Sequence, residues 1–201
     1  MISNMITIFR TLLTIPLFAL LAFGGNAWIA LALFLGAGAL DMVDGKVARA
    51  RNETSAFGAM IDLLGDRLLT FATVAGLAIG SDYYRAPALL GLVLIVRDVI
   101  VATLNEALPG KLEIRVSVLE KVKIAAAFLA LSLLMAGEAF FRVAGEQVWA
   151  LPDAPDAGWG SAVFGAYAGH AGAIAMLIAV ALTVITIVQY WMRALKAFRE
   201  G

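Results

Sequence analysis

The amino-acid sequence predicts an all-α, polytopic membrane protein: a bundle of six transmembrane helices with both termini in the cytoplasm. Hydrophobic residues make up 62% of the 201-residue chain, a share that soluble domains of this length rarely reach. They gather in six runs, each about as long as the roughly 20 residues with which a helix crosses a bilayer. Basic residues gather between these runs on one side, and this asymmetry predicts the orientation.

The six runs follow one another with short polar connections. They lie near residues 5–24, 27–44, 56–80, 86–107, 121–143 and 163–190. Arg10 interrupts the first run, and no small-residue cleavage site precedes the second, so we expect the first run to be a span and not a cleaved signal peptide. The longest polar linkers, near 108–120 and 144–160, are too short to fold alone. We therefore expect one integral-membrane domain over residues 1–201.

The charges between the runs indicate which side faces the cytoplasm. The side that holds the N-terminus and Arg10 also carries most of the basic residues: Lys46, Arg49, Arg51, Lys111, Arg115, Lys121, Lys123, Arg193, Lys196 and Arg199. The opposite loops hold only Arg85 and Arg142, beside several acids. Because cytoplasmic loops carry the excess of Lys and Arg, both termini should be cytoplasmic. The formal net charge is zero, so nothing in the charge points to nucleic acid as a partner.

Four aspartates stand at the turn between the second and third runs. Asp41 and Asp44 are three residues apart and Asp62 and Asp66 are four apart, so each pair shares one face of its helix. The two helices run antiparallel around a turn near Glu53, which places the pairs at matching depths. At a rise of 1.5 Å per residue, the inner positions lie roughly 13 Å from the centre of the turn. We expect the four carboxylates to converge just inside the cytoplasmic leaflet.

Such a cluster needs counter-charge, because each acid buried in a membrane costs several kcal/mol. Oxygen ligands alone suit a hard cation such as Mg²⁺ or Mn²⁺, and four carboxylates can hold two such ions, as phosphoryl-transfer sites do. Small residues at Gly45, Ala48 and Gly58 would leave room for a flat ligand, although close helix packing also explains the glycines. Arg49, one turn beyond Gly45, is placed to meet phosphate oxygens.

Residues 41–66 match, at every fixed position, the pattern D-x-x-D-G-x-x-A-R, eight residues, then G-x-x-x-D-x-x-x-D. In this the chain resembles the CDP-alcohol phosphotransferase family. The resemblance implies transfer of a substituted phosphate from a CDP-linked lipid, CDP-diacylglycerol, to an alcohol, with release of CMP at the cytoplasmic face of the inner membrane. It implies that Asp41, Asp44 and Asp62 are metal ligands and that Asp66 is the general base and also a ligand. The CDP pocket would be lined by Thr7, Gly45, Ala48, Arg49 and Gly58.

Three further segments are similar to bacterial branches of this family that make phosphatidylglycerophosphate or cardiolipin. They are the opening Asn4 to Arg10, the pair Arg97-Asp98, and the basic start of the fifth run at Lys121 and Lys123. The resemblance implies an acceptor or phosphate site formed by Arg97, Arg115, Lys121 and Lys123. Glycerol 3-phosphate is the first acceptor that we expect. Phosphatidylglycerol, giving cardiolipin, and inositol phosphate are the alternatives.

Two other classes of membrane protein also use buried carboxylates. An ion- or proton-coupled transporter often shows repeated, broken helices in both halves, whereas the acids of this chain cluster in one half. Prenyl-transferring enzymes resemble a longer bundle with two separated aspartate-rich motifs, and this chain has one compact motif. Glycines four apart at Gly76 and Gly80, and at Gly165 and Gly169, predict close helix packing within a protomer or between two protomers of a homodimer.

Overall fold

The computed structural model describes residues 2–51, 56–107, 118–150 and 158–199, and side chains over most of these ranges. Within them the chain is entirely helical, as the sequence predicts, and it contains no strand. The helices are α1 (Ile2–Leu12), α2 (Thr14–Ala22), α3 (Ala27–Arg51), α4 (Ala56–Gly80), α5 (Arg85–Leu90), α6 (Leu92–Ala107), α7 (Val118–Ala150) and α8 (Trp159–Arg199). Each predicted apolar run is helical over most of its length.

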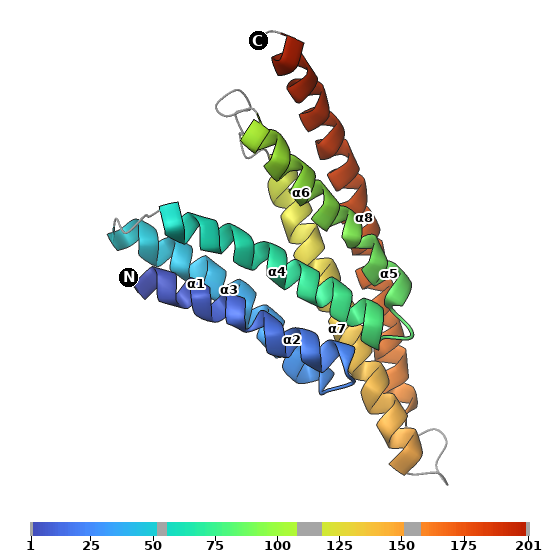
Figure 1. Ribbon diagram of the computed structural model, residues 1–201. Coiled ribbons are helices and arrows are strands. Elements are labelled where there is room, and N and C mark those ends of the chain that lie inside the picture. The colour runs from blue at the N-terminus through green and yellow to red at the C-terminus, as the bar shows by residue number, and fades with distance from the viewer. Residues whose placement is uncertain (1, 52–55, 108–117, 151–157, 200–201) are drawn as a thin grey trace.

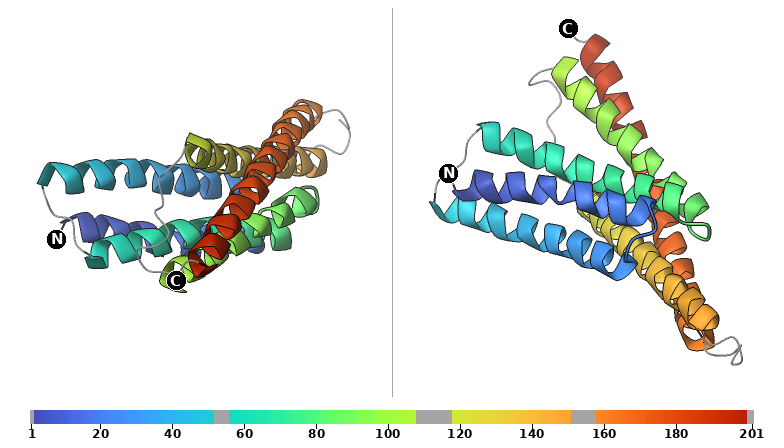
Figure 2. Two further views of the ribbon diagram at one scale, coloured as in Figure 1. Left: turned by 90° about the horizontal axis from the view of Figure 1, so that it is seen from above. Right: turned by 60° about the horizontal axis from the view of Figure 1, so that its bottom comes forward.

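The helices form two arms that separate toward the two termini (Figures 1 and 2). In one arm α1 and α2 pack against α3 and α4, and in the other α8 packs along α7 and α6. The arms join where α3 contacts α7 and where α4 contacts α5 and α6. The start of α1, the end of α3 and the start of α4 lie at the free end of the first arm, and the end of α8 lies at the free end of the second (Figure 1).

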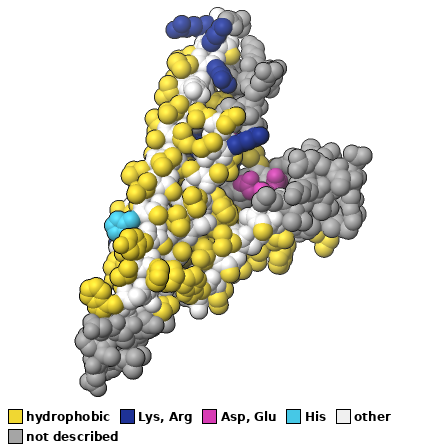
Figure 3. Space-filling model, turned by 180° about the vertical axis from the view of Figure 1, so that it is seen from behind, with side chains coloured by type: hydrophobic (Ala, Val, Ile, Leu, Met, Phe, Trp, Pro, Cys, Tyr) yellow, Lys and Arg dark blue, Asp and Glu magenta, His cyan; other side chains and the backbone are white. Residues whose placement is uncertain are grey.

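Among the residues that the structure describes, four segments are long and apolar enough to cross a membrane. They are Met60–Gly80, Arg85–Ala107, Val118–Gly145 and Trp159–Ala197. Two shorter apolar helices, Thr7–Ala22 and Ala27–Asp41, precede them. Hydrophobic side chains cover the outer face of the second arm, and Lys and Arg gather near its free end (Figure 3). This pattern is that of a helical protein whose sides face lipid.

Local sequence explains how the first hairpin is built. Pro16 lacks an N–H and its ring crowds the carbonyl four residues earlier, so α1 and α2 are separate helices that meet at Leu13. Gly24 follows α2 with a φ of 75°, the left-handed conformation that closes many helices. The side chain of Asn26 then caps α3 by accepting hydrogen bonds from the N–H groups of Trp28 and Ile29, at 3.0 and 3.1 Å.

The paired glycines bring backbones together inside one protomer. A Cβ atom at Gly80 would lie 1.9 Å from the carbonyl oxygen of Leu21, so α4 touches the end of α2 directly. A Cβ atom at Gly169 would lie 2.0 Å from the ring of Tyr84, whose hydroxyl donates to the carbonyl of Gly165 at 2.7 Å. Burial raises the pKa of Tyr84, so this hydroxyl stays protonated and remains a donor. These glycines therefore pack helices within the chain.

A buried polar network fixes the joined end of the arms. Arg142 of α7 donates to the carboxylate of Glu138 at 2.8 Å and to the carbonyls of Leu21, Gly25 and Gly80 at 3.2, 2.6 and 3.3 Å. These carbonyls belong to the last turns of α2 and α4 and to the turn after α2, where no helical donor remains for them. Arg142 thus ties three helices together at the end opposite the aspartates. The charge pattern of the sequence placed it in a loop, whereas it lies within α7.

Candidate active site

Three of the four predicted aspartates come together on two antiparallel helices. Asp41 lies on α3, and Asp62 and Asp66 lie one turn apart on α4. One carboxylate oxygen from each lies within 4.8 Å of the others, and all three side chains are about half exposed. This convergence confirms the geometry that the spacing predicts. Asp44 follows Asp41 by one turn of α3, but its side chain lies outside the described part of the structure.

Arg10 reaches the centre of this carboxylate cluster from a third helix, α1. Its guanidinium pairs with Asp41, with Asp62 at 2.6 Å and with Asp66 at 2.9 Å, and its side chain is only 2% exposed. The sequence did not assign Arg10 to the aspartate site: it marked a break in the first run and the cytoplasmic side, and it ended the opening Asn4 to Arg10. The signal that could have revealed its role was the cost of a lone charge inside an apolar segment.

The carboxylate cluster fits a hard divalent cation. Its donors are oxygens, they converge from two helices, and their side chains are about half exposed. Three carboxylates and the one guanidinium of Arg10 sum to a charge of −2, so a divalent cation would balance these four groups. With Asp44 on the next turn, the set also has the ligand chemistry of a two-metal phosphoryl-transfer site.

The predicted CDP pocket is described only in part. Thr7 is buried on α1, one turn before Arg10 and on the same face. Gly45, Ala48 and Arg49 belong to the second half of α3, and Gly58 belongs to the first turn of α4. The side-chain surroundings of these four residues lie outside the described part of the structure, so their role stays a prediction.

A second charged cluster lies on α6 and α7. Arg97 pairs with Asp98 at 2.9 Å and with Glu120, while Lys123 pairs with Glu120 at 3.2 Å and with Asp98 at 3.8 Å. Arg97 and Lys123 are 8% and 6% exposed, so the two cations of this charge cluster are buried, whereas Asp98 is partly exposed. The ring of Tyr190, from α8, covers Arg97 with its centroid 5.6 Å from the guanidinium carbon.

The structure therefore brings together two of the four residues predicted for the acceptor. Arg97 and Lys123 meet in the charge cluster, and Lys121 is exposed on α7. Arg115 lies outside the described residues. Asp98, Glu120 and Tyr190, which the sequence did not assign to the acceptor site, complete the surroundings of the two cations.

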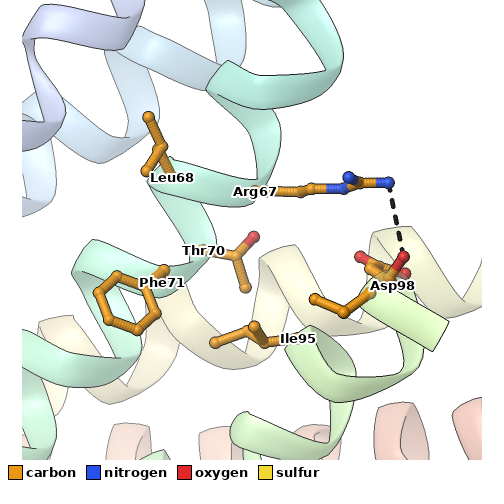
Figure 4. A pocket seen from close by; sticks show the side chains of 7 residues that line it. Arg67, Leu68, Thr70, Phe71, Ile95 and Asp98 are labelled. Atoms are coloured by element: carbon orange, nitrogen blue, oxygen red, sulfur yellow. Dashed lines mark hydrogen bonds between the residues drawn. The ribbon is translucent and has the colours of Figure 1, made fainter. Parts of the chain in front are cut away.

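Arg67 connects the two clusters. It follows Asp66 on α4, and its guanidinium donates to the backbone carbonyl of Asp98 on α6 at 3.4 Å (Figure 4). Beneath this contact is a cavity of about 150 Å³ with an apolar lining, in which Thr70 and Phe71 face Ile95 (Figure 4). The helix that carries two of the aspartates is thus held against the helix that carries Arg97.

The fold, the aspartate signature and its geometry define a class of membrane-bound transferase. The chain belongs to the CDP-alcohol phosphatidyltransferase family, whose model matches residues 1–198. It is accordingly an enzyme that transfers a substituted phosphate group in phospholipid synthesis.

Individual relatives in this family agree on one name. The chain is similar to the CDP-diacylglycerol–glycerol-3-phosphate 3-phosphatidyltransferase of Cereibacter sphaeroides, with 29% identity over 86% of this chain and 84% of the relative. Proteins of the same name are 29% identical in Wigglesworthia glossinidia brevipalpis, over 71% of this chain and 80% of the relative, and 30% identical in Escherichia coli K12, over 67% and 76%. The comparison with solved structures found no significant match.

Proposed function

We propose that this protein transfers the phosphatidyl group of CDP-diacylglycerol to glycerol 3-phosphate, releasing CMP and forming phosphatidylglycerophosphate. The observation that carries the proposal is the convergence of Asp41, Asp62 and Asp66 within 4.8 Å, inside the aspartate signature. The names of the relatives support glycerol 3-phosphate as the acceptor. The nearby charge cluster of Arg97 and Lys123 supplies donors suited to a phosphate.

The membrane setting follows from the apolar helices and the loop charges. Six crossings accommodate the four long spans together with Thr7–Ala22 and Ala27–Asp41. In that arrangement both termini and the free ends of the two arms are cytoplasmic, because the basic residues lie there. The lipid donor then reaches the carboxylate cluster from the cytoplasmic leaflet of the inner membrane, and the water-soluble acceptor reaches it from the cytoplasm.

Each part of the reaction has residues to perform it. Asp41, Asp44, Asp62 and Asp66 would hold one or two Mg²⁺ or Mn²⁺ ions, which neutralise charge on the pyrophosphate and on the departing CMP. Thr7, Gly45, Ala48, Arg49 and Gly58 would hold the cytidine and its phosphates.

Asp66 accepts the proton of the acceptor hydroxyl as that oxygen attacks the phosphorus that bears diacylglycerol. The bond from this phosphorus to the oxygen of CMP breaks, and CMP leaves with the electron pair. The acceptor is held by Arg97 and Lys123, and Lys121 and Arg115 are the further basic residues predicted for its site. No protein nucleophile is needed, because the acceptor itself attacks.

An acceptor panel tests the proposal. Purified protein with CDP-diacylglycerol and Mg²⁺ is offered glycerol 3-phosphate, phosphatidylglycerol, inositol phosphate or free inositol, and lipid products are identified by mass spectrometry. We expect phosphatidylglycerophosphate as the dominant product. Faster formation of cardiolipin or of an inositol lipid would reject glycerol 3-phosphate as the acceptor while leaving the transferase class intact.

A further inference from the structure

The two cations that suit an acceptor phosphate are already paired with carboxylates of the chain. The charge cluster holds two basic and two acidic groups, which sum to zero. Glu120 neutralises the two cations more effectively than Asp98 does. Its two oxygens separately contact Arg97 and Lys123, and its side chain is only 14% exposed. A phosphate that approaches Arg97 and Lys123 therefore meets the negative charge of Glu120.

The charge cluster also retains polar atoms suited to a ligand. The Nε atom of Arg97 and the hydroxyl of Tyr190 are buried and have no hydrogen-bond partner among the described residues. Both side chains are more than nine-tenths buried. Buried donors of this kind are ordinarily satisfied by protein, water or a ligand. The balanced charges of the cluster would not by themselves indicate a ligand. The two buried donor groups that lack a partner in the described part of the structure do indicate one.

Building on the proposed function, we propose that Glu120 is a specificity-determining residue of the acceptor site. Its carboxylate competes with the phosphate of the acceptor for Arg97 and Lys123, and it thereby lowers the affinity for phosphorylated acceptors. The same carboxylate stabilises two buried cations that would otherwise repel each other. Glu120 thus contributes to the stability of the bundle and weakens binding of an anionic substrate at the same position.

The change Glu120→Gln removes the charge and nearly preserves the shape. Like charges a few ångströms apart interact strongly in a partly buried site, so we expect the KM for glycerol 3-phosphate to fall about tenfold. The KM for CDP-diacylglycerol should stay unchanged, because the donor is held on α1, α3 and α4. Glu120→Asp keeps the charge and should retain a KM near that of the wild type. Glu106→Gln removes an exposed charge from the last turn of α6 and serves as the matched control.

A direct binding experiment separates this inference from the proposed function. Titration calorimetry with inorganic phosphate and with glycerol 3-phosphate should give about tenfold tighter binding to the Glu120→Gln protein than to the wild type, whether or not CMP is released. If no acceptor supports CMP release, the proposed function fails, and the titrations still decide the role of Glu120.

The alternative is that Glu120 is only structural. In that case Glu120→Gln would lower the melting temperature and kcat with every acceptor and would leave both the acceptor KM and the phosphate affinity unchanged, which would overturn the inference. Should the glutamine variant fail to fold, Glu120→Ala is measured in the same way, and its phosphate affinity is expected to rise as well. An unchanged affinity in the alanine variant would count against the inference equally.

Discussion

Asp66 and Arg67 are consecutive residues with different partners. Asp66 faces the carboxylate cluster and Arg10, whereas Arg67 reaches across to the backbone of Asp98. The same turn of α4 thus contacts both the carboxylate cluster, where we propose that the lipid donor binds, and the helix that carries Arg97, where we propose that the acceptor binds. This arrangement lets the roles of single side chains be separated by kinetics.

Asp66→Asn should abolish turnover and largely preserve binding of the lipid donor. A general base acts on the acceptor hydroxyl, and its loss typically costs a factor of about 10² to 10⁴ in rate. The measurement is the affinity for CDP-diacylglycerol beside the initial rate of CMP release at fixed Mg²⁺. If affinity falls as steeply as rate, Asp66 is mainly a metal ligand and another group takes the proton.

Arg97→Ala should raise the acceptor KM and leave the donor KM nearly unchanged. Loss of one charge-assisted contact costs about 1.5–3 kcal/mol, which corresponds to a roughly ten- to hundredfold higher KM for glycerol 3-phosphate. The substitution also leaves Asp98 and Glu120 with less counter-charge, so the melting temperature is measured in parallel. Steady-state kinetics with each substrate varied in turn measure both KM values. An unchanged KM for glycerol 3-phosphate would show that Arg97 does not bind the acceptor.

Helix α7 carries two separate sets of polar contacts, one in each half. Its first turns carry Glu120 and Lys123 of the charge cluster, and its second half carries Glu138 and Arg142, which hold the ends of α2 and α4. The aspartates depend on this second contact indirectly, because α4 carries Asp62 and Asp66. The hydrogen bonds of Arg142 hold the end of α4 beside the end of α2.

Arg142→Gln should destabilise the protein by about 3 kcal/mol, because removing one partner of a buried ion pair leaves the other charge uncompensated. Glu138 is 4% exposed, and the carbonyls of Leu21, Gly25 and Gly80 lose a donor as well. Unfolding in mixed detergent micelles measures the effect. Arg85→Gln at the same end is the control. Arg85 and Asp82 form a solvent-exposed ion pair, so this change should cost less than about 1 kcal/mol. Equal effects would contradict a special role for Arg142.

The sequence predicted the features that depend on local geometry. The convergence of Asp41, Asp62 and Asp66 follows from helical spacing and one antiparallel turn, both of which are local properties. The place of Arg10 could not be predicted in this way, because it depends on which helix lies beside α3 and α4. The length of α8 was also missed: the apolar run near 163–190 marks its lipid-facing part, but the helix continues to Arg199. Lys196 and Arg199 interact favourably with the C-terminal end of the helix dipole, so they can stabilise the last turns of α8. Hydropathy marks only the apolar part of a helix and therefore does not reveal this polar extension.

At the scale of the whole molecule, the two arms place the carboxylate cluster on one side and the charge cluster on the other. The contact between Arg67 and Asp98 spans the two, and the arms separate beyond it toward the termini (Figure 1). The proposed orientation puts these free ends in the cytoplasm, where a phosphorylated, water-soluble acceptor is present. The orientation decides which side can deliver the acceptor, so it has its own test.

Single cysteines report the orientation without background, because the chain contains no cysteine. A cysteine in place of Asp82, in the turn between α4 and α5, should react with an impermeant thiol reagent in intact spheroplasts. A cysteine in place of Arg199, at the end of α8, should react only after the membrane is permeabilised. The reversed pattern would place the aspartates on the outer side and would refute the proposed route of the acceptor.

Asp41, Asp62 and Asp66 are proposed to form a metal-dependent site for phosphatidyl transfer. The most direct measurement is the rate of CMP release from CDP-diacylglycerol and glycerol 3-phosphate as Mg²⁺ or Mn²⁺ is titrated into chelator-treated protein, for the wild type and for Asp62→Asn. The wild type should be inactive in chelator and should regain activity along a saturating curve as metal is added. Asp62→Asn should stay inactive at metal concentrations that saturate the wild type. Release of CMP in chelator, or near-normal release by Asp62→Asn, would contradict the account.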